Sequence, residues 1–254
     1  MPQELRLQGK KTLVTGSDTG IGHEIALEFA RQGADVVFHY VESDAGVRDA
    51  VEQVKTMGRK SAAFQADFDI LEQVTRLADQ AGEFLGGVDC LVNNAGVTMN
   101  RPFLKVTPEQ FDKMFHINFR GQYFLTQRIV EDMLRRGGGV ICNMSSVHGL
   151  QGVPDHSVYA ATKGAIIAYT RSLAVELAYK GIRVNASAPG PIRTPLQVSG
   201  GATQEKLEKF GGQTPLGRPG QPAELGSIYV QLAMSDASFA TGQVYGSAGG
   251  SGQP

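Results

Sequence analysis

The chain is 254 residues long, with 41% hydrophobic and 19% charged residues and a formal net charge of −1. These values are typical of a globular protein with a sizeable core, and the length suits one α/β domain. The near-neutral charge and the lack of a run of Lys and Arg argue against binding to nucleic acid or to an anionic membrane surface.

Other features of the composition bear on location and metal binding. No stretch approaches about 18 consecutive apolar residues, so no transmembrane helix is expected, and the first ten residues do not resemble a secretion signal. Cys90 and Cys142 each lie in an apolar run typical of a buried strand. Two such thiols predict a reducing, cytoplasmic location, although a disulfide between them stays open. No His/Cys cluster has zinc-ligand spacing, so we expect no metal site.

Short apolar runs alternate with segments of helical periodicity along the whole chain. The expected strands span residues 11–15, 35–40, 61–66, 88–92, 140–144, 182–187 and 241–245. The expected helices span residues 23–32, 43–57, 69–84, 107–136, 158–179 and 222–234, with a short helical piece near 205–210. This alternation predicts a parallel, doubly wound sheet of about seven strands with helices on both faces. Because no linker of disordered composition divides the chain, we expect a single Rossmann-type α/β domain over residues 1–254.

Local signals define two helix starts and one long loop. Asp69 is placed to cap the third helix, with Glu72 at the reciprocal position of a capping box. Thr107 and Pro108 start the fourth helix, which is expected to be long or broken. The segment 189–220 is rich in Gly, Pro and Thr. Loops of that length in compact domains are often lids, so we expect a substrate loop there.

Distinctive polar and glycine-rich stretches follow four of the expected strands. They are the loop 16–22, Asn93-Asn94-Ala95-Gly96, Ser145-Ser146 and Pro189-Gly190. In doubly wound sheets, ligands bind beyond the carboxyl ends of the strands, where the strand order switches. The convergence of four such strand ends predicts a ligand site at that edge of the sheet.

The loop 16–22 reads Gly-Ser-Asp-Thr-Gly-Ile-Gly and runs from strand to helix. Gly16 permits a tight turn, while Gly20 and Gly22 let the backbone approach a pyrophosphate at the helix N-terminus. The spacing differs from the G-x-G-x-x-G fingerprint. The loop also lacks the Gly-Lys-Ser/Thr ending of a P-loop, which argues against hydrolysis of nucleoside triphosphates.

Tyr159 and Lys163 lie four positions apart in the helix expected over 158–179. On a helix, such residues share one face, with Cβ atoms about 5–6 Å apart. A phenol titrates near pH 10, roughly three units too high for easy proton exchange at neutral pH. A neighbouring positive charge favours the phenolate, so we expect Lys163 to lower the Tyr159 pKa and make the phenol a general acid/base.

Taken together, these motifs closely resemble the classical short-chain dehydrogenase/reductase family. The matching elements are Thr15-Gly16-x-x-x-Gly20-Ile21-Gly22, Asn93-Asn94-Ala95-Gly96, Ser146, Tyr159-x-x-x-Lys163 and Pro189-Gly190. They occur in the family's order and spacing over nearly the whole chain. The resemblance implies NAD(P)-dependent interconversion of an alcohol and a carbonyl, in which the cofactor carries the hydride and the protein supplies orientation and a proton.

The resemblance also implies roles for individual residues. Tyr159 would be the general acid/base, and Lys163 would bind the nicotinamide ribose and lower the Tyr159 pKa. Ser146 would bind the carbonyl, with Ser145 a mere neighbour, and Asn118 would hold a proton-relay water. The implied cofactor contacts are Gly16, Asp18, Thr19, Gly20, Ile21, Gly22, Tyr40, Asp67, Phe68, Asn94, Ala95, Gly96, Tyr159, Lys163, Pro189, Gly190, Ile192 and Thr194.

The usual signals for choosing between NAD and NADP are both missing. NAD-dependent members usually carry an acid at the end of the second strand, where Tyr40 stands here. NADP-dependent members usually carry Arg or Lys at the positions of Thr19 or Val41. Glu42 lies close by and would repel a 2′-phosphate, so we prefer NAD, with use of both cofactors left open.

The resemblance suggests several substrates and an assembly. The stretch 143–148 resembles that of glucose 1-dehydrogenases, which makes a sugar a candidate among secondary alcohols and ketones. A 3-oxoacyl-thioester reductase is the alternative, although no basic cluster surrounds the expected lid. A catalytically silent NAD(P)-binding sensor is the alternative of another class. Family likeness also suggests a homotetramer. His148 follows the serines, and we favour a loop position for it over substrate contact.

Overall fold

The computed structural model describes residues 5–42, 44–201 and 204–252. Within these residues, seven parallel strands form one sheet with the order β3-β2-β1-β4-β5-β6-β7. The strands are β1 (Lys11–Val14), β2 (Asp35–Tyr40), β3 (Ser61–Gln65), β4 (Cys90–Asn93), β5 (Gly139–Met144), β6 (Ile182–Pro189) and β7 (Val244–Ser247). The doubly wound α/β prediction is confirmed, and the order reverses between β1 and β4, where a ligand crevice is expected.

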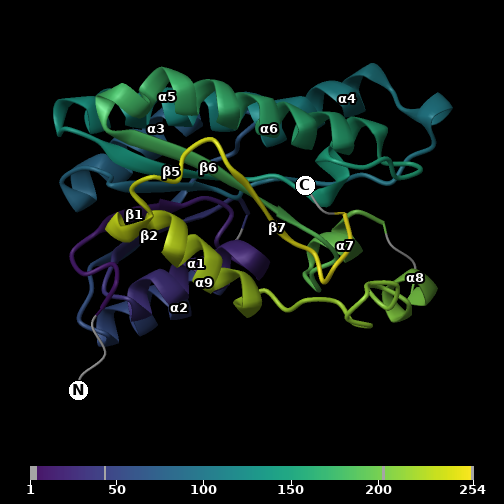
Figure 1. The fold of residues 1–254 in the computed structure, drawn as a ribbon, viewed down its shortest axis with the longest axis horizontal. Coiled ribbons are helices and arrows are strands. Elements are labelled where there is room, and N and C mark those ends of the chain that lie inside the picture. The colour runs from purple at the N-terminus through teal and green to yellow at the C-terminus, as the bar shows by residue number, and fades with distance from the viewer. Residues whose placement is uncertain (1–4, 43, 202–203, 253–254) are drawn as a thin grey trace.

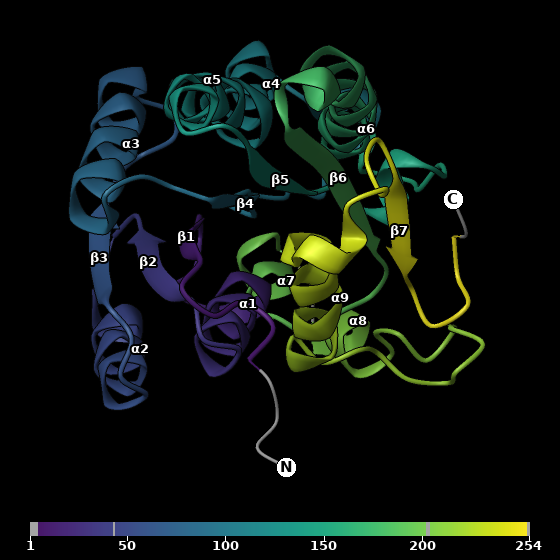
Figure 2. The ribbon, with the colours of Figure 1, turned by 60° about the vertical axis from the view of Figure 1, so that its left-hand side comes forward.

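Helices cover both faces of the sheet (Figures 1 and 2). One face carries α1 (Gly20–Arg31), α2 (Ala45–Thr56) and α9 (Ala223–Ala233). The other face carries α3 (Leu71–Leu85), α4 (Pro108–Phe115), α5 (Gly121–Arg135) and α6 (Ser157–Leu177). Among the described residues, none of the helices has the length and apolar character that a membrane crossing requires.

Two hydrophobic cores follow from the alternation of side chains along each strand. Val36 and Phe38 of β2 point into the core beneath α1 and α9, whereas Val37 between them points into the core beneath α3 and α5. Since both faces are buried, the strands are almost continuously apolar. Each fully buried side chain of this size stabilises the fold by roughly 1.5–3 kcal/mol relative to exposure.

The helix expected over residues 107–136 is broken. It starts with the predicted capping box, in which Thr107 accepts from the Gln110 backbone and the Gln110 side chain accepts from the Thr107 backbone. Residues 116–120 then form a single π-helical turn between α4 and α5. Such turns insert one extra residue and often occur at functional sites.

Two predicted boundaries are wrong. Asp69 does not cap α3, whose N-cap residue is Ile70 without a side-chain cap. The Asp69 carboxylate instead contacts His116 Nδ1 at 2.8 Å, a tertiary pair that local capping rules cannot anticipate. The last strand lies at Val244–Ser247 rather than 241–245. Residues 241 and 242 contact β6 in another way: the Val184 amide donates to Thr241 Oγ1, and the Gly242 amide donates to the Val184 carbonyl.

The segment 189–220 extends from the carboxyl end of β6 and carries two short helices. These are α7 (Leu196–Ser199) and α8 (Gln204–Glu208), at the right of Figure 1. The helical piece near 205–210 was expected, whereas α7 was not. One turn of helix has too little periodicity for a sequence pattern to reveal it.

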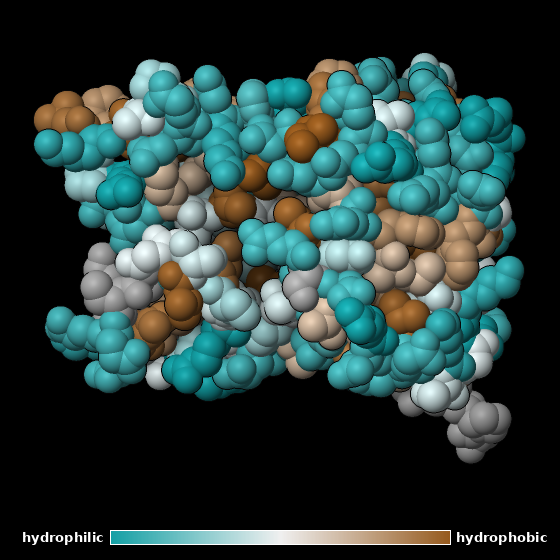
Figure 3. Space-filling model, turned by 180° about the vertical axis from the view of Figure 1, so that it is seen from behind, coloured by the Kyte–Doolittle hydropathy of each residue, from teal (hydrophilic) through white to brown (hydrophobic). Residues whose placement is uncertain are grey.

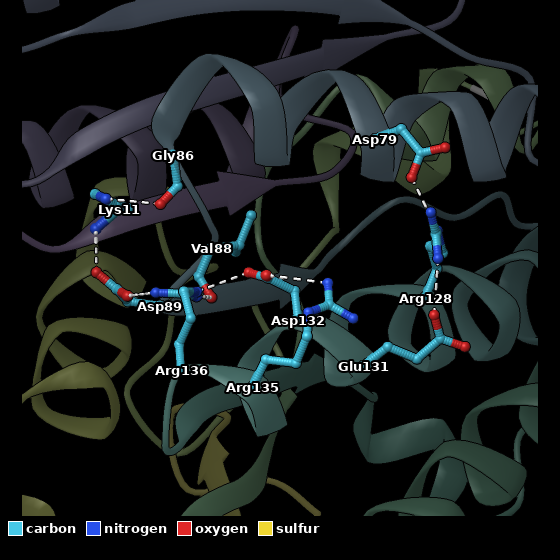
Figure 4. Close-up of polar contacts among 10 residues, drawn as sticks. All are labelled: Lys11, Asp79, Gly86, Val88, Asp89, Arg128, Glu131, Asp132, Arg135 and Arg136. Atoms are coloured by element: carbon cyan, nitrogen blue, oxygen red, sulfur yellow. Dashed lines mark hydrogen bonds and ion pairs between the residues drawn. The ribbon is translucent and has the colours of Figure 1, made fainter.

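At the opposite, amino end of the sheet, Arg136 ties α5 to two strands (Figure 4). Its guanidinium contacts Asp89 Oδ1 at 2.6 Å and Asp132 Oδ2 at 2.7 Å, and it also donates to the Val88 carbonyl. The other oxygen of Asp89 accepts from the Lys11 backbone amide at 3.0 Å. We call this set of contacts the Arg136 clamp. It fixes the end of the molecule that lies away from the expected site.

Candidate active site

The glycine loop is built to leave backbone amides exposed to a ligand. Gly16 has φ +57°, and a Cβ on Gly22 would lie 2.3 Å from the Gly16 carbonyl oxygen. α1 already begins at Gly20, and its N-cap Thr19 makes no side-chain hydrogen bond to the first turn, which carries no acidic residue. The free amide groups of that turn suit a bound anion. The residues present therefore fit a dinucleotide pyrophosphate.

Asn94 and Thr15 join the glycine loop to the end of β4. The Asn94 amide donates to the carbonyls of Thr15 at 2.9 Å and Gly16 at 2.7 Å. In return, Thr15 Oγ1 accepts from the backbone amides of Asn94 and Ala95, both at 3.0 Å. The structure thus brings the first and fourth strand ends together as predicted. Thr15 was part of the recognised motif, but its function as the connecting hydroxyl could not be inferred from sequence.

The four expected catalytic residues come from three elements. Tyr159 and Lys163 share one face of α6, with Lys163 Nζ 5.5 Å from the centroid of the Tyr159 ring. Ser146, at the end of β5, lines a cavity together with Tyr159, and its Oγ accepts from the His148 amide at 3.2 Å. Lys163 Nζ donates to the Met144 carbonyl at 2.8 Å.

The expected depression of the Tyr159 pKa is wrong for the protein alone. Burial raises the pKa of Tyr159 to about 12, and the nearby Ser146 hydroxyl opposes this rise. Burial also lowers the pKa of Lys163 to about 8. Sequence spacing placed the ammonium near the phenol, but it could not show that both groups lie in a poorly solvated interior, where the charged form of each is disfavoured.

Ser145 is a neighbour, as expected, and has a clear structural part. Its buried Oγ donates to the Lys163 carbonyl at 2.9 Å, and Lys163 Nζ in turn donates to the carbonyl of Met144, the residue before Ser145. The two contacts fix α6 against the end of β5. They therefore set where Tyr159 stands relative to Ser146.

Asn118 lies in the π turn and is fully buried. Its side chain exchanges two hydrogen bonds with the backbone of Val97, at 2.8 and 2.9 Å, and donates to Thr162 Oγ1 at 3.1 Å. These contacts occupy the amide, so a relay water would have to bind a backbone carbonyl of the turn. Gly96 lies beside it, since a Cβ there would be 3.2 Å from Asn118 Oδ1 and 3.7 Å from Lys163 Nζ.

The residues expected at the adenosine end line the carboxyl ends of β2 and β3. Tyr40 and Asp67 are half-buried, and Asp67 Oδ1 accepts from the Asp69 amide at 2.9 Å. Phe68 is 2% exposed, and its ring packs against His39, 5.0 Å between centroids. Phe68 can therefore meet a ligand through its backbone alone.

The expected contacts after β6 reach back over the glycine loop. A Cβ on Gly20 would lie 3.4 Å from the Thr194 side chain, and Ile192 is buried beneath this segment. Gly190 is packed so closely against Ala248 that a Cβ would lie 2.7 Å from the Ala248 Cα. The strand end at Pro189 is also buried. The structure thus places every expected cofactor residue along one edge of the sheet.

A cavity of about 800 Å³ opens beside Tyr159 and Ser146. Its walls come from the ends of β4 and β5, the start of α6 and the segment 189–220. Seen from behind, the mainly hydrophilic surface is hollowed on the side that carries α7 and α8, with hydrophobic residues inside the recess (Figure 3). This cavity is the natural place for a substrate beside the phenol.

His148 lies in the wall of this cavity, in the short turn after β5, and the preference for a loop position over substrate contact stays a prediction. Its ring meets the Tyr159 ring edge-on at 5.8 Å and the His156 ring at 5.1 Å. Burial lowers the pKa of His148 to about 4, so the imidazole is neutral at pH 7. Its Nδ1 is buried without a hydrogen-bond partner in the described chain.

Comparison with known proteins agrees with this geometry. A family model described as "Enoyl-(Acyl carrier protein) reductase" (adh_short_C2) matches residues 16–251. Uncharacterized oxidoreductase YghA of Escherichia coli is 43% identical over 249 residues, which cover 96% of this chain and 83% of YghA. These matches extend over nearly all of the sheet and its helices.

Solved structures show the same fold with nicotinamide cofactors bound. 7α-hydroxysteroid dehydrogenase complexed with NADH and 7-oxo glycochenodeoxycholic acid has a TM-score of 0.91 at 34% identity, covering 97% of this chain and 96% of that one. A short-chain dehydrogenase from Burkholderia cenocepacia in complex with NADP has a TM-score of 0.89 at 29% identity, covering 96% and 98%. This chain therefore belongs to the short-chain dehydrogenase/reductase family and is an NAD(P)-dependent oxidoreductase that interconverts alcohols and carbonyls.

Proposed function

We propose that Tyr159 is the general acid/base and that Ser146, Lys163 and Asn118 position the reacting groups. The observation that carries this assignment is that Ser146 and Tyr159 line the wall of the same cavity, with Lys163 Nζ 5.5 Å from the centroid of the Tyr159 ring. A substrate oxygen there can accept hydrogen bonds from both hydroxyls. The bound nicotinamide supplies or accepts the hydride at the adjacent carbon.

The protonation states of Tyr159 and Lys163 at pH 7 support carbonyl reduction, because no proton has to be moved before the reaction starts. With a pKa of about 12, Tyr159 is a neutral phenol at pH 7 and can give its proton to the developing alkoxide. Lys163, 5.5 Å from the ring centroid, then stabilises the phenolate left behind. Oxidation of an alcohol runs the same steps backward and needs the phenolate first. Oxidation should therefore accelerate with rising pH.

The decisive experiment is to replace Tyr159 by Phe, which keeps the ring and removes the proton. Turnover of an alcohol or ketone panel, followed at 340 nm, should fall by a factor of about 10²–10⁴. Binding of NAD(P)H, measured by fluorescence titration, should stay close to that of the wild type. Undiminished turnover in the variant would refute the assignment. Tight cofactor binding by the wild type without turnover of any substrate would favour the silent sensor.

For the cofactor, we propose a preference for NAD over NADP. Tyr40 stands at the end of β2, and Glu42 beyond it is exposed. The nearby cation Arg48 contacts Asp44 at 2.6 Å, which lessens its attraction for a 2′-phosphate. The ratio of kcat/KM for the two cofactors, measured with one substrate, tests this preference; a ratio in favour of NADP would reverse it.

For the substrate, we propose a small polyhydroxylated alcohol or the matching ketone, such as a sugar. The cavity wall offers many side-chain hydrogen-bonding groups, including Asn100, His148, Gln151, Gln197 and Gln213. A 3-oxoacyl thioester on a carrier protein is the rival, in keeping with the name of the matched family model. Its acidic carrier would need a basic entrance, yet Lys209 of the lid contacts Glu205 at 2.8 Å. Sugars and 3-oxoacyl thioesters compared in the same assay separate these possibilities.

We also propose a homotetramer in a reducing compartment. Apolar side chains remain exposed on the outer helices, among them Tyr123 and Phe124 of α5 and Val175 of α6. Apolar surface of this kind often marks contact between subunits. The unpaired, buried thiols of Cys90 and Cys142 support the cytoplasmic expectation.

A further inference from the structure

His39, in β2, makes an unusual set of contacts with the glycine loop. Its Nδ1 accepts from the Gly16 amide at 2.8 Å. Its backbone amide donates to Ser17 Oγ at 2.9 Å, and its carbonyl accepts from the Ser17 amide at 3.0 Å. The residue is fully buried. One strand residue therefore holds both the first and second residues of the loop.

The other ring nitrogen of His39 reaches a different loop. Nε2 lies 2.8 Å from the carbonyl oxygen of Ala66, which directly precedes Asp67 and Phe68. The ring also packs against Phe68. The imidazole thus spans the distance between the glycine loop and the turn after β3, the two segments expected to bind opposite ends of the adenosine diphosphate half.

The contacts require a single tautomer. A carbonyl can only accept, so Nε2 must carry the hydrogen that Ala66 receives. An amide N–H can only donate, so Nδ1 must present its lone pair to Gly16. A protonated ring would place an N–H against the Gly16 amide, and that contact would be lost. Burial lowers the pKa of His39 below its usual 6.5, so the required neutral ring prevails at pH 7.

We propose that His39 is a positioning residue that sets the glycine loop for the cofactor, with Nδ1 as the essential contact. This inference rests on the proposed cofactor site at that loop. The Gly16 amide shares its peptide plane with the Thr15 carbonyl, which accepts from the Asn94 side chain at 2.9 Å. Without Nδ1 this peptide would be held from its carbonyl side alone, and the Gly16 amide would lose its acceptor. The charged groups whose fields reach the ring are Asp18 of the loop and Asp67 after β3.

Two substitutions separate the two ring nitrogens. Asn has a polar atom where His carries Nδ1, so His39→Asn can keep an acceptor for Gly16 while losing the contact with Ala66. Gln has a polar atom where His carries Nε2, so His39→Gln can keep the donor to Ala66 while losing the acceptor for Gly16. Each variant loses one buried hydrogen bond, so similar losses of thermal stability are expected.

Binding of NADH or NADPH, whichever the wild type binds more tightly, is the readout, measured by fluorescence titration. His39→Gln should raise the cofactor Kd by roughly tenfold or more, whereas His39→Asn should stay within about threefold of the wild type. The wild-type Kd should rise once the pH falls far enough below 6.5 to reach the lowered pKa of His39 and the ring gains a proton. His39→Asn should lack that rise, although Asp18 and Asp67 are both still present.

Equal Kd values for the two variants, or the same acid dependence in His39→Asn and the wild type, would overturn the inference while leaving the cofactor site in place. A wild type that binds neither NADH nor NADPH would instead refute the cofactor site itself, and His39's role with it. Thermal unfolding of both variants shows whether each is folded at the assay temperature.

Discussion

The ammonium of Lys163 is 3% exposed, with the Met144 carbonyl as its hydrogen-bond acceptor. Water would solvate this charge far better, so burial lowers the lysine pKa from 10.5 to about 8. A fall of that size corresponds to roughly 3 kcal/mol of destabilisation in the charged form. The proposed function accounts for this cost, since it uses the Lys163 ammonium as a cation beside the phenol.

Replacement of Lys163 by Met should therefore raise the free energy of unfolding at pH 7, by roughly 1–3 kcal/mol, while turnover is lost. The unfolded chain binds the lysine proton more tightly than the folded chain. The destabilisation of the folded wild type by the buried ammonium is thus fully present below pH 8 and is lost as the pH rises from about 8 to 10.5. Urea denaturation at pH 7 and pH 10 should show the Met variant's advantage shrinking at the higher pH. A variant less stable than the wild type at pH 7 would contradict this account.

At the scale of elements, the two ends of the sheet differ in their tasks. The carboxyl end carries loops with glycines, open amides and a cavity. The amino end carries the Arg136 clamp, which joins the end of α5 to the start of β4 and to β1 (Figure 4). Contacts that stabilise the fold thus lie at the amino end of the strands, and the proposed active site lies at their carboxyl end.

Loss of the clamp should lower stability without altering the chemistry. Arg136→Ala removes two ion contacts and a hydrogen bond from a guanidinium that is 27% exposed, and should reduce the free energy of unfolding by about 1–3 kcal/mol. Arg135 is the matched control, since it is 68% exposed and contacts Asp132 at 3.3 Å. Arg135→Ala should change stability by less than about 0.5 kcal/mol. Similar losses of unfolding free energy in both variants would show that the clamp contributes no more than a surface ion pair. A large fall in kcat for Arg136→Ala would show that the amino end of the sheet also serves the chemistry.

For the whole molecule, the exposed apolar side chains at the end of α6 are the feature to explain. Val175 is 81% exposed, and Tyr179, one turn further along, is 79% exposed. In a tetramer such side chains would be covered by a neighbouring subunit. The single chain leaves them in water.

Light scattering should therefore give a mass close to four times the 27.1 kDa of one chain. Val175→Glu should shift the population toward smaller species, because it would place a charge in the buried contact. The control is a charge change at Glu52 of α2, a side chain that already carries an exposed charge. Glu52→Lys should leave the mass unchanged. A monomeric wild type would rule out the tetramer.

The parallel, doubly wound sheet, the glycine loop and the pairing of Tyr159 with Lys163 could be predicted because each follows from local pattern and spacing. Burial is not local, and this is why the Tyr159 pKa was predicted in the wrong direction. The partner of Asp69 lies 47 residues away in sequence, beyond the reach of any capping rule.

Histidines were the weakest part of the sequence reading. The sequence gives His39 no distinguishing motif, and it places His148 after the serines without showing what its ring meets. The former joins two loops only because β2 lies between β1 and β3, and the latter meets Tyr159 only because β5 ends beside α6. An imidazole has two different nitrogens, and its function depends on what the fold places opposite each of them.

The π turn at residues 116–120 has a consequence for how this enzyme can change over evolutionary time. An extra residue is wound into the rod formed by α4 and α5, so deleting any one residue there would restore ordinary winding. The helices on either side would keep nearly the same relative orientation, because the wide turn takes up the extra residue locally. The residues of the turn itself would shift, however, and Asn118 would lose its hydrogen bonds with the Val97 backbone. Insertions and deletions should therefore be far rarer in this turn than in the surface loops around it.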